Sequence, residues 1–236
     1  RLGGQPVTFL SATMSPSCFE YLASLFFCEL DETVVLRKPP VLFNHSYRVE
    51  RYTDNFSVVL IAVKQEFDLM SVGKVIVFVR SKDLCRALAD RMKSSVAETF
   101  LLVGGLDVDA VRAVTDAFVA APKAIMFATS CFGLGVDVPN VRAVLVLDLP
   151  FEFESLVQMF GRAGRDGGPA KCVLYINAGK EKTMVASMVR RREPAMKVTA
   201  IKDMLTAFDG APLCRRQVMA EYIDGHGRSC LPLGQA

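Results

Sequence analysis

Residues 73–95 read GKVIVFVRSKDLCRALADRMKSS, and this stretch decides the fold class. Its first seven residues are mostly apolar and β-branched, which is typical of a strand buried on both faces. The residues after it predict a helix, because Leu84, Leu88 and Met92 recur at positions i, i+4 and i+8. Ser81 or a neighbour can cap this helix. The stretch therefore predicts a strand that is followed directly by a helix.

Runs of the same two kinds alternate further along the chain. The strand-like runs cover residues 97–103, 123–129, 141–150 and 170–177, and the helical runs cover residues 107–121 and 154–165. Such alternation is typical of right-handed crossovers, so we predict an α/β fold with a parallel sheet and flanking helices. Binding sites in such sheets lie beyond the carboxyl ends of the strands, where the segments FVRS, FATSCFGLGVDVP and LDLP are expected.

The flanking regions have a different pattern. A helix is expected at residues 15–27, and residues 31–56 predict a crossing segment with turn and extended signals. Beyond residue 177, three helical runs follow one another without a strand between them, at residues 180–193, 199–208 and 214–223. These runs predict a small helical module after the sheet.

The composition indicates a globular protein. Of the 236 residues, 51% are apolar and 22% are charged, which is enough to bury a sizeable core. The longest apolar runs are too short to cross a bilayer, so no membrane partner is expected. The seven cysteines are irregularly spaced, which argues against a disulfide framework and for an intracellular, reducing compartment. The net charge of +3 does not by itself indicate nucleic acid.

Two arginines stand among small residues in the sequence QMFGRAGRDGG, residues 158–168. If the preceding helix continues, Gln158, Arg162 and Arg165 share one face of it. The glycines beside the arginines leave room for a phosphate, and a guanidinium fits phosphate oxygens. Asp166 can hold one of the two guanidinium groups in place. On spacing alone, a glycine-rich helix end with solvated arginines remains an equal alternative.

Four motifs in a fixed order resemble those of superfamily 2 helicases. They are SAT at residues 11–13, VIVFVRSKD at 75–83, ATSCFGLGVDVPNVRAVLVLDLP at 128–150 and QMFGRAGRDG at 158–167. The forms GRAGRDG and FGLGVD and the downstream CRR are similar to the RecQ family of DNA helicases. The resemblance covers nearly the whole chain.

The resemblance implies a RecA-like fold and a division into three parts. Residues 1–46 would end a first RecA-like lobe and form a linker, and residues 47–178 would form the second, helicase C-terminal lobe. Residues 179–236 would begin a truncated zinc-binding module of RecQ type. In this family, ATP lies between the two lobes. The nucleus is the expected location if the source is a eukaryote.

The resemblance also assigns residues to ATP. Arg162 and Arg165 would face the phosphates, one or both as arginine fingers, and Gln158 would sense the phosphates. Gly135 and Asp137 would couple the nucleotide cleft to DNA, with Asp137 contacting the ribose or orienting an arginine. The alternative for Gly135 and Asp137 is an ordinary turn.

A second group of residues is assigned to DNA, as single strands and duplex junctions. Thr129 and Ser130 would contact the DNA backbone, and Arg80 would contact a phosphate. Ser11 and Thr13 would lie at the hinge between the lobes. The alternatives are a solvated Arg80 and a strand-to-helix cap at Ser11 and Thr13. These residues do not predict an oligomeric state.

A cysteine pair in the last part of the chain resembles the start of the zinc module. Zinc takes four thiolate or imidazole ligands, and here Cys214 and Cys230 are accompanied only by His226 as a further candidate. Zn²⁺ at an incomplete site and two free thiols therefore both remain open. Arg215 and Arg216 would bind DNA phosphate or pack the module.

The sequence lacks two motifs that ATP hydrolysis requires. There is no G-x-x-x-x-G-K-[ST] loop for phosphates and no D-E-x-[HD] motif for Mg²⁺, so a first lobe would hold most of ATP and Mg²⁺. We expect this chain to be the C-terminal half of a 3′-to-5′ DNA helicase that cannot hydrolyse ATP alone. The alternatives are a non-catalytic nucleic-acid-binding remnant and an RNA helicase of the same superfamily.

Overall fold

The computed structural model describes residues 8–11, 13–27, 33–37, 41–53, 55–132, 137–150, 152–191, 193–206 and 214–225. The chain divides into two compact units, one of residues 43–193 and one of residues 1–42 with 194–236. The first unit extends beyond residues 47–178 on both sides. The functional division into three parts stays a prediction.

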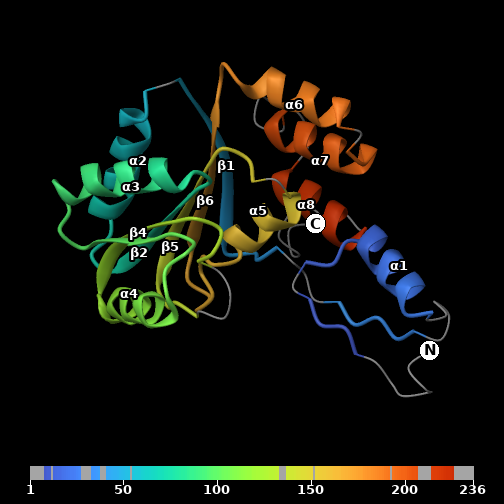
Figure 1. Ribbon diagram of the computed structural model, residues 1–236, viewed down its shortest axis with the longest axis horizontal. Helices are drawn as coiled ribbons and strands as arrows, with labels where there is room; N and C mark the ends of the chain where they lie inside the picture. The colour runs from blue at the N-terminus through green and yellow to red at the C-terminus, as the bar shows by residue number, and fades with distance from the viewer. Residues whose placement is uncertain are drawn as a thin grey trace, which may run out of the picture. The chain divides into compact units, whose positions relative to one another are not determined.

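The unit of residues 43–193 is built on a six-stranded parallel sheet. Its strands are β1 (His45–Tyr52), β2 (Gly73–Val79), β3 (Thr99–Leu102), β4 (Lys123–Ala128), β5 (Val141–Leu147) and β6 (Ala170–Asn177). They lie in the order β1-β6-β5-β2-β4-β3 (Figure 1). All strands therefore begin at one edge, the amino edge, and end at the other, the carboxyl edge. The predicted α/β fold with a parallel sheet is confirmed.

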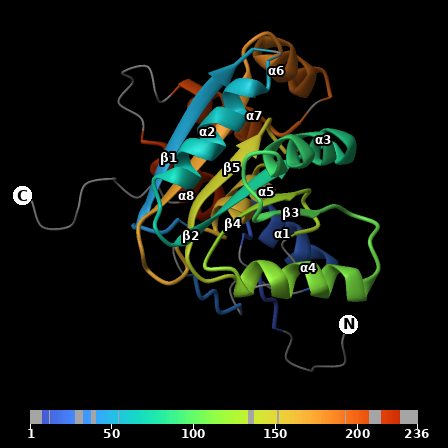
Figure 2. The same ribbon diagram turned by 90° about the vertical axis from the view of Figure 1, so that its left-hand side faces the viewer.

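Helices cover both faces of the sheet. The helices of this unit are α2 (Ser57–Asp68), α3 (Lys82–Lys93), α4 (Val108–Ala120), α5 (Phe153–Phe160) and α6 (Glu181–Arg190). The buried residues of α2 and α3 pack with alternate residues of the strands in one core cluster. Figure 2 shows α4 away from α2 and α3, below the sheet. The sheet is thus the middle of three layers.

The predicted strand and helix of residues 73–95 are confirmed as β2 and α3. All seven residues of β2 are buried, including Lys74, whose Nζ lies 6.0 Å from the centre of the Phe118 ring. Burial lowers the pKa of Lys74. At the start of α3, the Leu84 N–H donates to Ser81 Oγ over 3.3 Å, so Ser81 is the cap.

Two elements were missed in the sequence, and one was drawn too long. Residues 45–52 form β1, an edge strand with exposed arginines whose partner β6 lies more than 100 residues away. Residues 57–68 form α2, for which no helix was predicted. The helix expected at residues 154–165 ends at Phe160 in α5.

The second unit holds three helices among its described residues, α1 (Pro16–Leu25), α7 (Ala195–Thr206) and α8 (Arg215–Asp224). Arg37 Nη1 donates to the carbonyls of Met14 and Ile223, over 2.8 and 3.1 Å, and so links the segment before α1 to α8. Arg215 Nε donates to Met204 O, and Arg216 Nη1 to Leu42 O. In this structure both arginines therefore pack the module.

The segment of Ser11 and Thr13 makes a local turn. The Thr13 N–H donates to Ser11 Oγ over 3.2 Å, while Ser15 caps α1 through the Cys18 N–H. The cap of this helix is therefore neither Ser11 nor Thr13, and their hinge role stays a prediction. Among the described residues, no helix is long and apolar enough to cross a membrane.

Candidate functional site

The two arginines lie in a loop rather than on a helix. We call residues 161–168 the arginine loop, because α5 ends at Phe160 and Gly161 is its C-cap. The Arg162 N–H donates to Met159 O over 3.1 Å, as a turn beyond the helix. The predicted common helix face is therefore wrong: Gln158, an exposed residue, is on α5, while Arg162 and Arg165 follow it in turns.

Gly164 is required by packing inside the protein. Its φ is +52°, and a Cβ there would lie 2.5 Å from Asn44 Nδ2 and 2.7 Å from the Gly168 carbonyl oxygen. Its N–H donates to Val141 O over 2.9 Å, at the first residue of β5. The interpretation that this glycine clears space for a phosphate is therefore wrong, because the space is filled by the protein itself.

Arg165 is held from two sides. Its Nε donates to Gly161 O over 3.0 Å, and its Nη1 donates to Asp137 Oδ1 over 3.1 Å. Asp137 thus orients an arginine in this structure, which was one of its two expected roles. The side chain of Arg165 is 36% exposed and that of Asp137 is 80% exposed, so the pair faces solvent.

Arg162 adds a second positive charge beside this pair. Burial of its guanidinium lowers the pKa of Arg162, the charge of Arg165 lowers it further, and Asp137 raises it. The two guanidinium groups therefore repel each other across a short stretch of the loop, with Asp137 bound to Arg165. Such a place favours an additional anion, because the anion would relieve the repulsion between the guanidinium groups.

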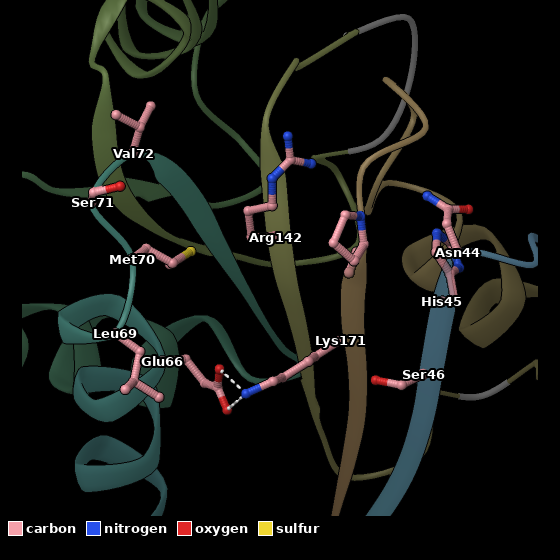
Figure 3. Close-up of a pocket in the computed structure, with 12 residues that line it drawn as sticks. Asn44, His45, Ser46, Glu66, Leu69, Met70, Ser71, Val72, Arg142 and Lys171 are labelled. Carbon is pink, nitrogen blue, oxygen red and sulfur yellow. Dashed lines mark hydrogen bonds and ion pairs between the residues drawn. The ribbon is translucent and has the colours of Figure 1, made fainter.

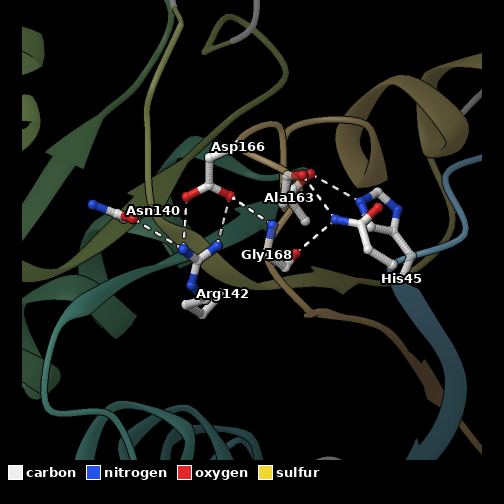
Figure 4. A network of polar contacts seen from close by, with 8 residues as sticks. His45, Asn140, Arg142, Ala163, Asp166 and Gly168 are labelled. Atoms are coloured by element: carbon white, nitrogen blue, oxygen red, sulfur yellow. Dashed lines mark hydrogen bonds and ion pairs between the residues drawn. The ribbon is translucent and has the colours of Figure 1, made fainter.

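Asp166 does not hold either of these arginines. It accepts two parallel bonds from Arg142, from Nη1 to Oδ1 over 2.8 Å and from Nη2 to Oδ2 over 2.6 Å (Figure 4). Arg142 Nη2 also donates to Asn140 Oδ1, and the Gly168 N–H donates to Asp166. The hydrogen bonds from Arg142 hold the pKa of Asp166 well below its ordinary range. Asp166 therefore does hold a guanidinium, as predicted, but that of Arg142 and not that of Arg162 or Arg165.

Asn44, just before β1, and His45, the first residue of β1, also bind the arginine loop. Asn44 Nδ2 donates to the carbonyls of Gly164 and Gly168, over 2.8 and 2.6 Å. His45, 4% exposed, has Nε2 at 2.9 Å from Ala163 O, so this nitrogen carries the proton and donates. Nothing in the local sequence pattern marks Asn44 or His45, because their partners lie about 120 residues away.

The residues expected to meet DNA lie at the carboxyl edge. Arg80 directly follows β2, and Ser130 lies just beyond β4, and both are exposed. Thr129 is only 6% exposed, and its Oγ1 accepts the Gly104 N–H over 3.1 Å. A Cβ at Gly105 would lie 3.5 Å from the Lys82 ammonium, so a further cation is close to this loop.

The arginine loop and the expected DNA contacts are thus at opposite edges of the sheet. The seven residues of β5 separate the edges by roughly 20 Å. Ser130 follows β4 and Asp137 precedes β5, so the two residues belong to the same connection of the chain, in which residues 133–136 lie outside the described residues. Gly135, the second residue expected in this segment, lies outside the described residues. The arginine loop therefore does not lie at the carboxyl ends of the strands, where the binding sites of such sheets were expected, and the roles of both groups stay predictions.

The zinc prediction has no support. Cys214, the N-cap of α8, is disulfide-bonded, and a disulfide sulfur is not the thiolate that zinc binds. Cys230 and His226 lie outside the described residues. Within the part of the chain that the structure describes, no group of three or more His, Cys, Asp or Glu side chains could hold a metal ion.

Known proteins resemble the chain in sequence. Residues 59–167 match the helicase conserved C-terminal domain. ATP-dependent helicase SGS1 of Saccharomyces cerevisiae is 27% identical over 202 residues, which are 83% of this chain and 14% of that protein. ATP-dependent DNA helicase Q4 of Homo sapiens is 54% identical over 65 residues, 28% of this chain and 5% of that protein. ATP-dependent DNA helicase RecQ of Pasteurella multocida is 29% identical over 153 residues, 64% of this chain and 24% of that protein.

Solved structures share the fold. The chain matches S. cerevisiae Dbp5 bound to RNA and ADP BeF3 with a TM-score of 0.61 and 19% identity, over 76% of this chain and 47% of that one. It matches Mss116p DEAD-box helicase domain 2 bound to an RNA duplex with a TM-score of 0.54 and 20% identity, over 65% and 60%. The parallel sheet therefore has the RecA-like fold of helicase C-terminal domains. Residues 59–167 thus carry the helicase conserved C-terminal domain, and in sequence the chain is similar to RecQ-family helicases, of which it spans only a small part.

Proposed function

We propose that the protein containing this chain is an ATP-dependent 3′-to-5′ DNA helicase, in which the arginine loop serves ATP and the carboxyl edge serves DNA. The observation that carries the proposal is that Arg165, bound to Asp137, lies close enough to Arg162 for their charges to act on each other in a loop beside solvent. Two neighbouring guanidinium groups at a solvent-facing loop suit the phosphates of a nucleotide.

The fit of ATP to these residues is partial. Arg162, Arg165 and Gln158 supply donors for phosphate oxygens, while no cluster of carboxylates among the described residues would bind Mg²⁺. We therefore assign the adenine, most phosphate contacts and Mg²⁺ to a first lobe. When bound, ATP supplies the phosphoryl group whose transfer to water drives the cycle.

The chemical role of Arg165 follows from its fixed position. Its guanidinium would stabilise the negative charge that develops on the transferred phosphoryl group. The bonds from Nε to Gly161 O and from Nη1 to Asp137 Oδ1 hold the guanidinium from two sides. Arg162 would add charge beside it.

The connection between the two edges supplies a route for coupling. Residues 129–140 carry Ser130 at the carboxyl edge and Asp137 beside Arg165. A movement of Arg165 toward phosphate would act on Asp137 and so on the segment that ends at the DNA contacts. Arg80 and Ser130 would bind phosphates of the DNA backbone, which carries no sequence information.

The test is Arg165→Ala in the full-length protein. We expect kcat for DNA-stimulated ATP hydrolysis to fall by about 10³-fold or more, with the affinity for single-stranded DNA unchanged. The matched control is Arg86→Ala, which removes an exposed arginine on α3 that pairs with Asp83 over 3.3 Å. It should hydrolyse ATP like the wild type.

Other outcomes separate the alternatives. Wild-type turnover in Arg165→Ala would refute the arginine-finger assignment. A full-length protein that binds DNA in a salt-sensitive way but never hydrolyses ATP is the non-catalytic remnant. Hydrolysis that is stimulated by RNA and not by DNA indicates an RNA helicase.

A further inference from the structure

We propose that Arg142 is a positioning residue for ATP hydrolysis, which acts by fixing Asp166 and, through the loop backbone, Arg165. This inference rests on the proposed function, because it gives Arg142 a role in the action of Arg165. Arg142 lies at the second position of β5, outside the arginine loop. Its side-chain hydrogen bonds described above go to Asp166 and Asn140.

The first step is that Arg165 stands between two anchored residues. Before it, Gly164 is fixed by its N–H bond to Val141 O and by Asn44. After it, Asp166 is fixed by Arg142 through two bonds. The backbone on one side of Arg165 is therefore tied to the start of β5 by main-chain atoms, and on the other side by a side-chain pair.

The second step is that the Arg142 guanidinium is wedged against the loop. A Cβ at Gly168 would lie 2.7 to 2.9 Å from three atoms of the guanidinium group. The Gly168 N–H and Asn140 Oδ1 close the network around the same two side chains (Figure 4). The planar fork of arginine makes two parallel bonds to one carboxylate, which a lysine cannot reproduce.

The third step is that water can reach the Arg142 side chain, so that position 142 tolerates a smaller polar residue. It lies on the wall of an open pocket of about 560 Å³ at the amino edge (Figure 3). Lys171, on the neighbouring strand, lines the same pocket and is paired with Glu66 over 2.7 Å. Water can therefore enter where the guanidinium was, so a smaller polar residue at position 142 would not leave a sealed cavity.

Loss of the pair would affect the reaction more than the binding of nucleotide. The phosphates would still meet two cations, but Arg165 would lose its fixed position relative to the transferred group. A misplacement of about 1 Å can reduce a rate by roughly 10²-fold. We therefore expect kcat to fall while KM for ATP changes little.

The experiment uses Arg142→Gln and Asp166→Asn in the full-length protein, with DNA present. Both variants should lower kcat by about 10- to 100-fold with KM within about threefold. Both should bind ADP as the wild type does but bind ADP with beryllium fluoride more weakly, because that complex adds a phosphate mimic for Arg165 to contact. Arg142→Lys should recover little of the lost rate.

A matched control and a double variant identify the route. Arg51→Gln removes a two-bond arginine–carboxylate pair with Glu181 that lies far from the loop, at the end of β1, and it should leave kcat unchanged. In an Arg165→Ala background, Arg142→Gln should cause no further loss, because the group it positions is already absent.

The outcomes are decisive in both directions. Wild-type kcat in Arg142→Gln, beside a defective Arg165→Ala, would overturn this inference and leave the arginine-finger proposal intact. A full additional loss in the double variant would also overturn it, since Arg142 would then act independently of Arg165. An active Arg165→Ala variant would instead refute the proposed function itself.

Discussion

The two edges of the sheet carry their polar residues in different ways. At the amino edge, the arginine loop has the carbonyls of Ala163, Gly164 and Gly168 bound by Asn44 and His45, and its aspartate is bound by Arg142. At the carboxyl edge, the side chains of Arg80 and Ser130, the residues expected to meet DNA, are exposed, while Thr129 Oγ1 accepts the Gly104 N–H and Asp148 accepts from the Tyr52 hydroxyl and the Asn177 N–H.

The difference fits the two tasks that we propose. A group that stabilises charge on one transferred atom needs a fixed backbone, because catalysis is sensitive to small displacements. A surface that follows a repeating phosphate backbone needs charge and access more than exact placement. We therefore expect substitutions at the amino edge to disturb stability or kcat, and substitutions at the carboxyl edge to disturb binding.

The largest expected effect on stability is that of Gly164→Ala. A left-handed backbone costs an alanine about 1 to 2 kcal/mol, and forcing a methyl group into a filled space costs about 1 to 3 kcal/mol more. We expect the free energy of unfolding to fall by roughly 2 to 5 kcal/mol, measured by urea denaturation.

Gly167→Ala is the control for the space around Gly164. Gly167 also has a positive φ, of +79°, but a Cβ there would meet nothing within 4 Å. It should therefore cost about 1 kcal/mol, the backbone term alone. Equal losses in the two variants would mean that the packing against Asn44 does not matter.

The next prediction distinguishes Thr129 from Arg80, which the sequence analysis both assigned to DNA. Thr129→Val keeps the shape of the side chain but leaves the Gly104 N–H without its acceptor, which should cost about 1 to 3 kcal/mol of stability. Arg80→Gln should leave stability unchanged, weaken DNA binding and reduce the salt dependence of log K by about 1. Both are measured by urea unfolding and by DNA titration at several salt concentrations.

The opposite pattern would reverse our assignment at the carboxyl edge. If Thr129→Val kept full stability and lost DNA affinity, the buried hydroxyl would have to turn outward to meet DNA. If Arg80→Gln bound DNA with an unchanged salt dependence, Arg80 would be a solvated side chain.

The sequence was sufficient where the structure is determined locally. The unit β2–α3 was predicted because a buried strand, a capping serine and an i, i+4 apolar pattern are all local signals. It was insufficient for β1, whose charged residues suit an edge strand and whose pairing with β6 is set by tertiary contacts. The roles of Arg162, Arg165 and the DNA contacts stay predictions.

The arginine loop shows the same limit within one motif. The spacing of Gln158, Arg162 and Arg165 fits a helical face, but α5 ends before either arginine. The reasons for the glycine at 164 and the aspartate at 166 lie in Asn44 and Arg142, which are 120 and 24 residues away. Local spacing cannot reveal such partners, because the sheet brings them together only after folding.

The smallest expected effect on stability is that of Asp166→Asn, and its dependence on pH identifies its cause. Because Arg142 holds the pKa of Asp166 below its ordinary value of 3.8, the pair stabilises the fold above that pH. The contribution is lost as pH falls through the lower pKa of the folded state. The pair is partly exposed, so we expect a loss of at most about 1 kcal/mol at pH 7, and less in high salt.

The difference in Tm between wild type and Asp166→Asn should be constant from pH 7 to about pH 5 and should shrink below about pH 4. Asp83→Asn is the control, because the Asp83 side chain is 97% exposed and its substitution should leave Tm unchanged at every pH. A difference that persists undiminished in acid would mean that Asp166 stabilises the loop without its charge. An asparagine oxygen can still accept the Gly168 N–H, so the loss of that bond would not explain the lower stability of the variant. The ion pair with Arg142 would then not be the interaction by which Asp166 stabilises the loop.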